Sequence, residues 1–196
     1  MRHWWWRAIA SVAILSCGFL SACDESQQFF SSNRNSPDQR SQTPEFKTHV
    51  EGNLFSFQYP HDWSLDSYGG MPFYIVATNY PPEKATAQAL PSAIRTGVAL
   101  RSGTVEQLLA EIEADQKSRI IKKEVMTVNG QKVVRCWLTT SKFGFTDAIV
   151  SYIPYGDRQI GELVSYYGAS NPQALPTIEQ VHQSFRLLQS PSESKN

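Results

Sequence analysis

The dipeptide Asn129-Gly130 limits the fold more than any other short segment of this chain, because it stands between two runs of alternating apolar and polar residues. Asn-Gly at this position is the strongest short-range sign of a β-hairpin, since both central residues of the turn need a positive φ. Two further alternating runs follow, and a turn joins them. The four predicted strands are 122–128, 131–140, 145–153 and 159–167. Together they predict a four-stranded antiparallel meander.

Outside the meander, the sequence predicts three more strands and two amphipathic helices. The strands are expected at 55–59, 73–78 and 94–100. Thr104 and Gln107 have the spacing of a capping box, and the apolar residues after them recur at helical spacing, which predicts a helix over 105–117. A closing helix should begin near Asn171-Pro172. Its buried side is expected to carry Leu175, Ile178, Val181 and Phe185, with His182 at the border.

The two helices decide the layers of the fold. Each helix has a single apolar side, so each must cover a sheet to bury that side. The predicted class is therefore α+β: an antiparallel sheet of about six to seven strands, including the meander, flanked by helices in an α-β-α sandwich.

The N-terminal segment has the features of a secretory leader. Arg2 and Arg7 form a short cationic head, and the apolar stretch 8–20 is too short to span a bilayer as a permanent helix. The segment ends in Leu20-Ser21-Ala22-Cys23, which resembles the lipobox of bacterial lipoproteins. In those proteins the leader is removed before the cysteine, which then carries acyl chains. The resemblance implies that Cys23 is lipidated and anchors the mature chain to a membrane.

Changes in polarity predict four parts of the chain. The leader is 1–22. Residues 23–45 are almost entirely polar and cannot supply a core face, so they are expected to form the lipidated end and a flexible tether. The folded domain is expected over 46–188, and the polar residues 189–196 form a tail.

Charge and cysteine usage exclude two classes of function. The chain has 18 Lys and Arg against 18 Asp and Glu, with no basic cluster that could follow a phosphate backbone, so nucleic acid is not expected as a partner. After removal of the leader and acylation of Cys23, Cys136 alone would remain as a thiol. No internal disulfide is then possible. Cys136 lies within an apolar strand and is expected to pack as a small apolar residue.

One group of residues resembles a known family. The pattern Phe55-x-Phe57-x-Tyr59-Pro60-x-x-Trp63, the central helix, the meander, and Ser184-Phe185 in the last helix resemble the PsbP-like superfamily. Its best-known members are extrinsic lumenal proteins of photosystem II, and other relatives are bacterial envelope lipoproteins of the DcrB type. The resemblance implies an α-β-α sandwich on the outer side of a bacterial cytoplasmic or thylakoid membrane, facing the periplasm or the lumen. From the residues themselves, the aromatic motif is expected to serve packing, because proline ends a strand and tryptophan can cover an apolar edge.

A divalent metal ion is one candidate ligand. His49, His61 and Asp62 lie on or beside the first predicted strand, and imidazole and carboxylate groups are ligands for zinc or manganese. The superfamily resemblance favours such a site, because PsbP proteins are reported as metal-associated. No repeated ligand spacing accompanies the three residues, so an exposed turn histidine and aspartate is the alternative interpretation.

No catalytic motif is present in the sequence. Four carboxylates fall on the first predicted helix, but their spacing favours a solvated face with i,i+4 ion pairs, Glu113 with Lys117 and Asp115 with Arg119. Nucleophile elbows, zinc-protease motifs and phosphate or dinucleotide loops are all missing from the chain. The sequence therefore predicts a protein that is not an enzyme and has no certain cofactor.

Three functional hypotheses follow. The first is a membrane-tethered lipoprotein that acts as an accessory or assembly factor of a membrane protein complex, photosystem II in a cyanobacterial host. The second is a general envelope lipoprotein that binds a metal or a small ligand. The third, a hydrolytic envelope enzyme, would need a deep polar cleft with a convergent catalytic site.

Overall fold

The computed structural model describes residues 44–68, 74–81, 90–156 and 158–188. The leader, Cys23, nearly all of the predicted tether and the tail lie outside these residues. No helix within the described ranges is long and apolar enough to cross a membrane.

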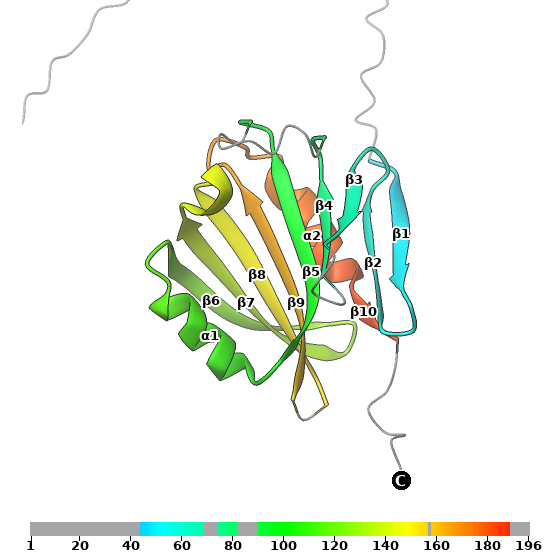
Figure 1. Cartoon of the computed structure of the whole chain (residues 1–196), viewed down its shortest axis with the longest axis vertical. Coiled ribbons are helices and arrows are strands. Elements are labelled where there is room, and N and C mark those ends of the chain that lie inside the picture. The colour runs from blue at the N-terminus through cyan, green and yellow to red at the C-terminus, as the bar shows by residue number, and fades with distance from the viewer. Residues whose placement is uncertain (1–43, 69–73, 82–89, 157, 189–196) are drawn as a thin grey trace, which may run out of the picture. The chain divides into compact units, whose positions relative to one another are not determined.

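A seven-stranded antiparallel sheet forms the centre of the domain (Figure 1). Its strands, in spatial order, are β3 (Ser64–Ser67), β4 (Tyr74–Thr78), β5 (Ile94–Ser102), β9 (Gln159–Tyr167), β8 (Asp147–Tyr155), β7 (Gln131–Thr140) and β6 (Ser118–Val128). The predicted meander is present as β6 to β9, and Asn129 and Gly130 both have positive φ at the turn between β6 and β7. The hairpin expected from this dipeptide is therefore confirmed.

The two helices cover opposite faces of this sheet (Figure 1). Helix α1 (Val105–Ala114) lies on one face and helix α2 (Ala174–Ser184) on the other. The predicted α+β class and the sandwich of helices around an antiparallel sheet are confirmed.

A second sheet of three strands shares the α2 side of the domain. It is built from β1 (Phe46–Glu51), β2 (Phe55–Pro60) and β10 (Arg186–Leu187), in the order β1-β2-β10. The aromatic motif predicted to serve packing lies in and after β2. Phe55 and Phe57 are completely buried, and Tyr59 and Trp63 nearly so. These rings join the large core between the small sheet, α2 and the seven-stranded sheet.

Several predicted boundaries were wrong. Helix α1 ends at Ala114, not at Lys117, because Asp115 adopts an extended backbone and its carboxylate accepts a hydrogen bond from the Lys117 backbone N–H. The chain thereby turns early, and β6 begins at Ser118. The strand expected from residue 145 begins later. The residues before it form a 3₁₀ turn, η2 (Lys142–Gly144), and β8 begins at Asp147.

The buried side of α2 also differs from the prediction. Ala174, Ile178, Val181 and His182 are its buried residues, whereas Leu175 is 38% exposed. The stripe begins at Ala174 and repeats at intervals of three and four residues, which leaves Leu175 on the flank. His182 is therefore a core residue and not a border residue.

Gly161 of β9 lets Phe185, the residue that follows α2, pack directly against the sheet. A Cβ at this position would lie 2.7 Å from the Cε1 atom of Phe185, and that ring packs against Phe55 with centroids 5.6 Å apart. Phe185 is almost completely buried, so it has no free space to move into.

We expect Gly161→Ala to lower the free energy of unfolding by about 1–3 kcal/mol, because an extra methyl in a packed core forces side chains off their preferred rotamers. Gly168→Ala is the matched control, since its Cβ would lie an ordinary 3.6 Å from its nearest neighbour, the Pro91 carbonyl oxygen. Urea unfolding of both variants measures the difference. Equal stability of the two would contradict the role assigned to Gly161.

Candidate functional site

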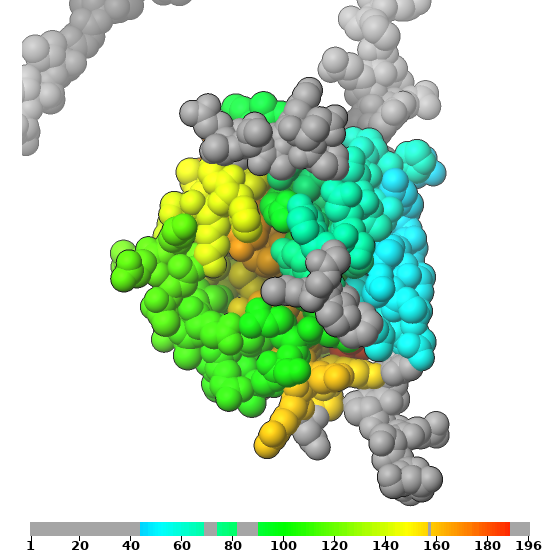
Figure 2. Space-filling view, in the orientation of Figure 1, coloured from blue at the N-terminus to red at the C-terminus, as the bar shows by residue number. Residues whose placement is uncertain are grey.

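A cleft of about 620 Å³ lies between α1 and the part of the seven-stranded sheet that α1 leaves open. Figure 2 shows the hollow between α1 and β4, with β8 and β9 in its depth. This volume is within the usual range for sites that bind small molecules. A second pocket, beside Trp63, has a volume of about 250 Å³, so the cleft is the larger of the two.

The cleft exists because α1 buries few apolar side chains. Only Val105 and Leu108 of this helix are fully buried, both in its first half. The floor beneath the second half is apolar and comes from the sheet, through Leu138, Val150 and Val164. α1 is thus anchored at its start and spans a gap towards its end.

Tyr74 forms the wall opposite α1. Its ring lies over Gly97 of β5, where a Cβ would come within 2.8 Å of the Tyr74 hydroxyl oxygen. The missing side chain at residue 97 therefore lets this tyrosine lie against the sheet. Burial raises the pKa of Tyr74, with Arg95 acting in the opposite direction.

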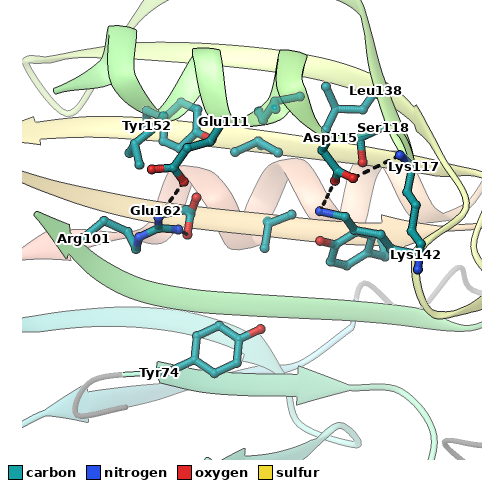
Figure 3. A pocket seen from close by; sticks show the side chains of 15 residues that line it. Tyr74, Arg101, Glu111, Asp115, Lys117, Ser118, Leu138, Lys142, Tyr152 and Glu162 are labelled. Atoms are coloured by element: carbon teal, nitrogen blue, oxygen red, sulfur yellow. Dashed lines mark hydrogen bonds and ion pairs between the residues drawn. The ribbon is translucent and has the colours of Figure 1, made fainter. Parts of the chain in front are cut away.

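One end of the cleft holds a cluster of one cation and two carboxylates (Figure 3). Arg101 of β5 donates to Glu111 of α1 at 2.8 Å and to Glu162 of β9 at 3.2 Å. Burial raises the pKa of Glu162, while Arg101 and a hydrogen bond from Tyr152 act to lower it. We call this group the Arg101 cluster.

The other end holds a second ion pair (Figure 3). Asp115, which directly follows α1, pairs with Lys142 of η2. The hydrogen bond from Lys142 is the main cause that lowers the pKa of Asp115, and the Lys117 backbone N–H adds to it. We call Asp115, Lys117 and Lys142 the Lys142 cluster.

These partners correct the ion pairs predicted from the sequence. Glu113 with Lys117 and Asp115 with Arg119 were expected as helical neighbours, but Lys117 and Arg119 lie beyond the end of α1. Asp115 instead finds its partner on η2, and Glu111 finds its partner on β5. One ion pair thus ties α1 to β5, and the other ties the residue after α1 to η2.

A cationic and aromatic group adjoins the Lys142 cluster through Phe143, which follows Lys142 in η2. The Arg95 guanidinium is 5.6 Å from the ring centroid of Tyr68 and 4.9 Å from that of Phe143. Phe143 has a positive φ of 56°, which is strained for a bulky residue, and its ring also contacts Tyr166 edge to face. Burial raises the pKa of Tyr166 to about 12. The sequence contained no signal for this arrangement.

On the opposite face of the sheet, a buried hydrogen-bond network surrounds His182. Its Nδ1 lies 2.8 Å from the Ser151 hydroxyl oxygen, and its Nε2 lies 2.9 Å from that of Ser165. The Arg135 Nε–H donates to Ser151 at 3.1 Å, and Thr96 contacts Ser165 at 2.7 Å. Because arginine only donates, Ser151 accepts from Arg135, and its hydroxyl is free to donate a hydrogen bond to Nδ1 of His182.

This serine and histidine group cannot act as a hydrolytic site. Ser151, Ser165 and His182 are all 2% exposed or less, and no described cleft reaches them. Nucleophilic catalysis needs a hydroxyl that a substrate can approach. The network is therefore structural.

The three residues considered as metal ligands do not come together. His49 stands opposite Phe57 on the β1-β2 hairpin, whereas the His61 backbone N–H bonds to Glu45. Four strand residues separate these positions, which is about 13 Å. The His49 imidazole instead contacts Glu51 at 3.0 Å, and Asp62 lines a separate shallow pocket beside Trp63. Within the described ranges, no group of three or more His, Cys, Asp or Glu side chains is placed to hold a metal ion.

Cys136 is completely buried, as the sequence predicted, and burial raises the pKa of its thiol. A raised pKa keeps the thiol protonated and unreactive.

Comparison with known proteins identifies the fold. No family model matches the sequence, and no curated protein matches it. Among solved structures, the solution structure of cyanobacterial PsbP (CyanoP) from Synechocystis sp. PCC 6803 is similar, with a TM-score of 0.51 and 11% sequence identity. The match covers 74% of this chain and 94% of that one. The chain therefore has a PsbP-like fold.

Lowering the pH should destabilise the protein through His182. Burial, with a smaller contribution from Arg135, lowers its pKa from 6.5 to about 3 in the fold. Between these values the unfolded chain binds a proton that the folded chain does not bind. The free energy of unfolding should therefore fall by about 1.4 kcal/mol per pH unit over this range.

Urea unfolding at pH 7 and pH 5 of the native protein and of His182→Gln measures this effect. Glutamine retains a donor and an acceptor but does not titrate. The native protein should lose about 2 kcal/mol more than the variant, because the other titrating groups cancel in the comparison. An equal loss in both proteins would show that His182 is not held neutral by the fold.

Proposed function

We propose that this protein is a lipid-tethered, non-enzymatic accessory or assembly factor of a membrane protein complex on the outer side of a bacterial cytoplasmic or thylakoid membrane. The observation that carries the proposal is the PsbP-like fold in a chain whose sequence begins with a leader and Leu20-Ser21-Ala22-Cys23. In a cyanobacterial host, photosystem II is the candidate complex.

The chemistry of the described residues supports a role in binding. The two glutamates of the cleft both accept hydrogen bonds from Arg101. The guanidinium stands between them and neutralises negative charge that the glutamates would need to act as a catalytic acid and base. The cleft lining contains no histidine and no cysteine. The histidine with serine partners, His182, is enclosed in the core.

In this proposal, the N-terminal segment sets the position of the domain. About two dozen polar residues behave as a flexible coil with a root-mean-square reach of roughly 25 to 30 Å, which holds a domain close to the membrane surface. More than one acyl chain at Cys23 makes such an anchor stable, whereas a single chain is marginal.

The alternative of a general envelope lipoprotein divides into two cases. The metal case loses support from the separation of His49 and His61 along the hairpin. The small-ligand case is supported by a specific observation, the cleft beneath α1.

Cys23→Ala should release the protein from membranes and abolish recovery of its partner complex. The test is affinity recovery of tagged protein from gently solubilised membranes of the native host. Cys17→Ala is the matched control, because it changes a cysteine within the leader and leaves the lipobox intact. Recovery of the same membrane proteins with Cys23→Ala as with the native chain, or of none with either, would refute the proposal.

A further inference from the structure

The cleft beneath α1 is electrically polarised. The Arg101 cluster contains one positive and two negative side chains, Arg101 with Glu111 and Glu162, and has a formal charge of −1. The Lys142 cluster contains the Lys142–Asp115 ion pair and the exposed Lys117, which bonds to Asp115 through its backbone N–H, and its formal charge is +1. The whole lining is neutral, but its two ends attract opposite charges.

The distance between the ends is short. Glu111 lies on α1 and Asp115 directly follows this helix, four residues on; Cβ atoms at that spacing on a helix are about 6 Å apart. Figure 3 shows the two clusters at opposite ends of the cleft, beneath the same helix. Two residues of extended peptide span about 7 Å, which matches this separation.

The surface between the ends is apolar and aromatic. Leu138, Val150 and Val164 form the floor, and Tyr74 and Tyr166 stand at the side. Such a surface favours an apolar group in the middle of a ligand.

From this arrangement we propose that the cleft binds a small zwitterion with an apolar centre, of the chemistry of a dipeptide. The ammonium group lies at Glu111 in the Arg101 cluster, and the carboxylate lies at Lys142. The apolar side chain of the ligand covers the floor. This site is independent of the membrane anchor, so its test and the test of the tether can fail separately.

The ion pairs of the cleft are exposed enough for a ligand to compete with them. The side chains of Arg101 and Glu111 are 38% and 60% exposed, and that of Lys142 is 37% exposed. Solvent-exposed pairs contribute little to stability, so a ligand can share or replace them. Glu162 is far less exposed and keeps Arg101 in place when Glu111 turns to a ligand.

The test is isothermal titration of the purified full-length protein with the dipeptide Ala-Leu and with two capped forms. N-acetyl-Ala-Leu lacks the ammonium group, and Ala-Leu-amide lacks the carboxylate. We expect saturable binding of free Ala-Leu and binding about tenfold weaker for each capped form, since each loses one charged contact. No saturable heat with Ala-Leu up to about 5 mM, or equal binding of all three, would overturn the proposal.

Two variants assign each charge to its end of the cleft. In Glu111→Gln, acetylation of the probe should no longer weaken binding, and in Lys142→Gln, amidation should no longer do so. Glu113→Gln and Lys132→Gln are matched controls, because both residues are exposed and neither lines the cleft. An equal loss of affinity in the controls, or a loss in Glu111→Gln that ignores which end of the probe is capped, would overturn the assignment.

Discussion

The neutral imidazole of His182 joins helix α2 to the middle of the seven-stranded sheet. Through Ser151 and Ser165 it contacts β8 and β9, and those serines extend the network to Arg135 of β7 and Thr96 of β5. A buried polar group that loses its partner costs about 1–3 kcal/mol, so a shift of α2 along the sheet would leave several such groups unpaired. The position of α2 in turn places Phe185 over Gly161 and brings the next residues into β10. The three-stranded sheet therefore depends on where His182 holds the helix.

This arrangement makes the two faces of the large sheet unequal. One face is covered by α2 and the small sheet, with a continuous aromatic and aliphatic core. The other face carries α1, which has ten residues and few buried side chains. Two ion clusters, centred on Arg101 and Lys142, hold the second half of α1 over the sheet, where its apolar side chains are only partly buried. The cleft is thus a consequence of covering a wide sheet with a short helix, and its polarity comes from the groups that hold that helix.

Sequence periodicity predicted the parts of this fold that local patterns determine. The hairpin at Asn129-Gly130, the strands of the meander and the start of α1 at its capping box follow from short-range rules. The separate small sheet could not be predicted, because β2 pairs with β10 about 130 residues later and β10 has only two residues. The Arg101 cluster was missed for the same reason: Glu162 meets Arg101 only through the pairing of β5 with β9. His182 was predicted at the border of the buried side because periodicity identifies the apolar face of a helix. It does not reveal polar partners on the sheet, such as the hydroxyls of Ser151 and Ser165.

At 11% identity, the similarity to cyanobacterial PsbP shows the fold alone. A core tolerates wide substitution as long as its volume and its apolar pattern are kept. Arg101, Glu111 and Lys142 are more than a third exposed, so the fold does not require these particular side chains. Residues that the core does not specify are those in which proteins of one fold can differ in function. What this domain recognises has therefore to be argued from the charged residues of its own cleft, which come from α1, η2 and the strands β5 and β9, and not from the solved structure that shares its fold.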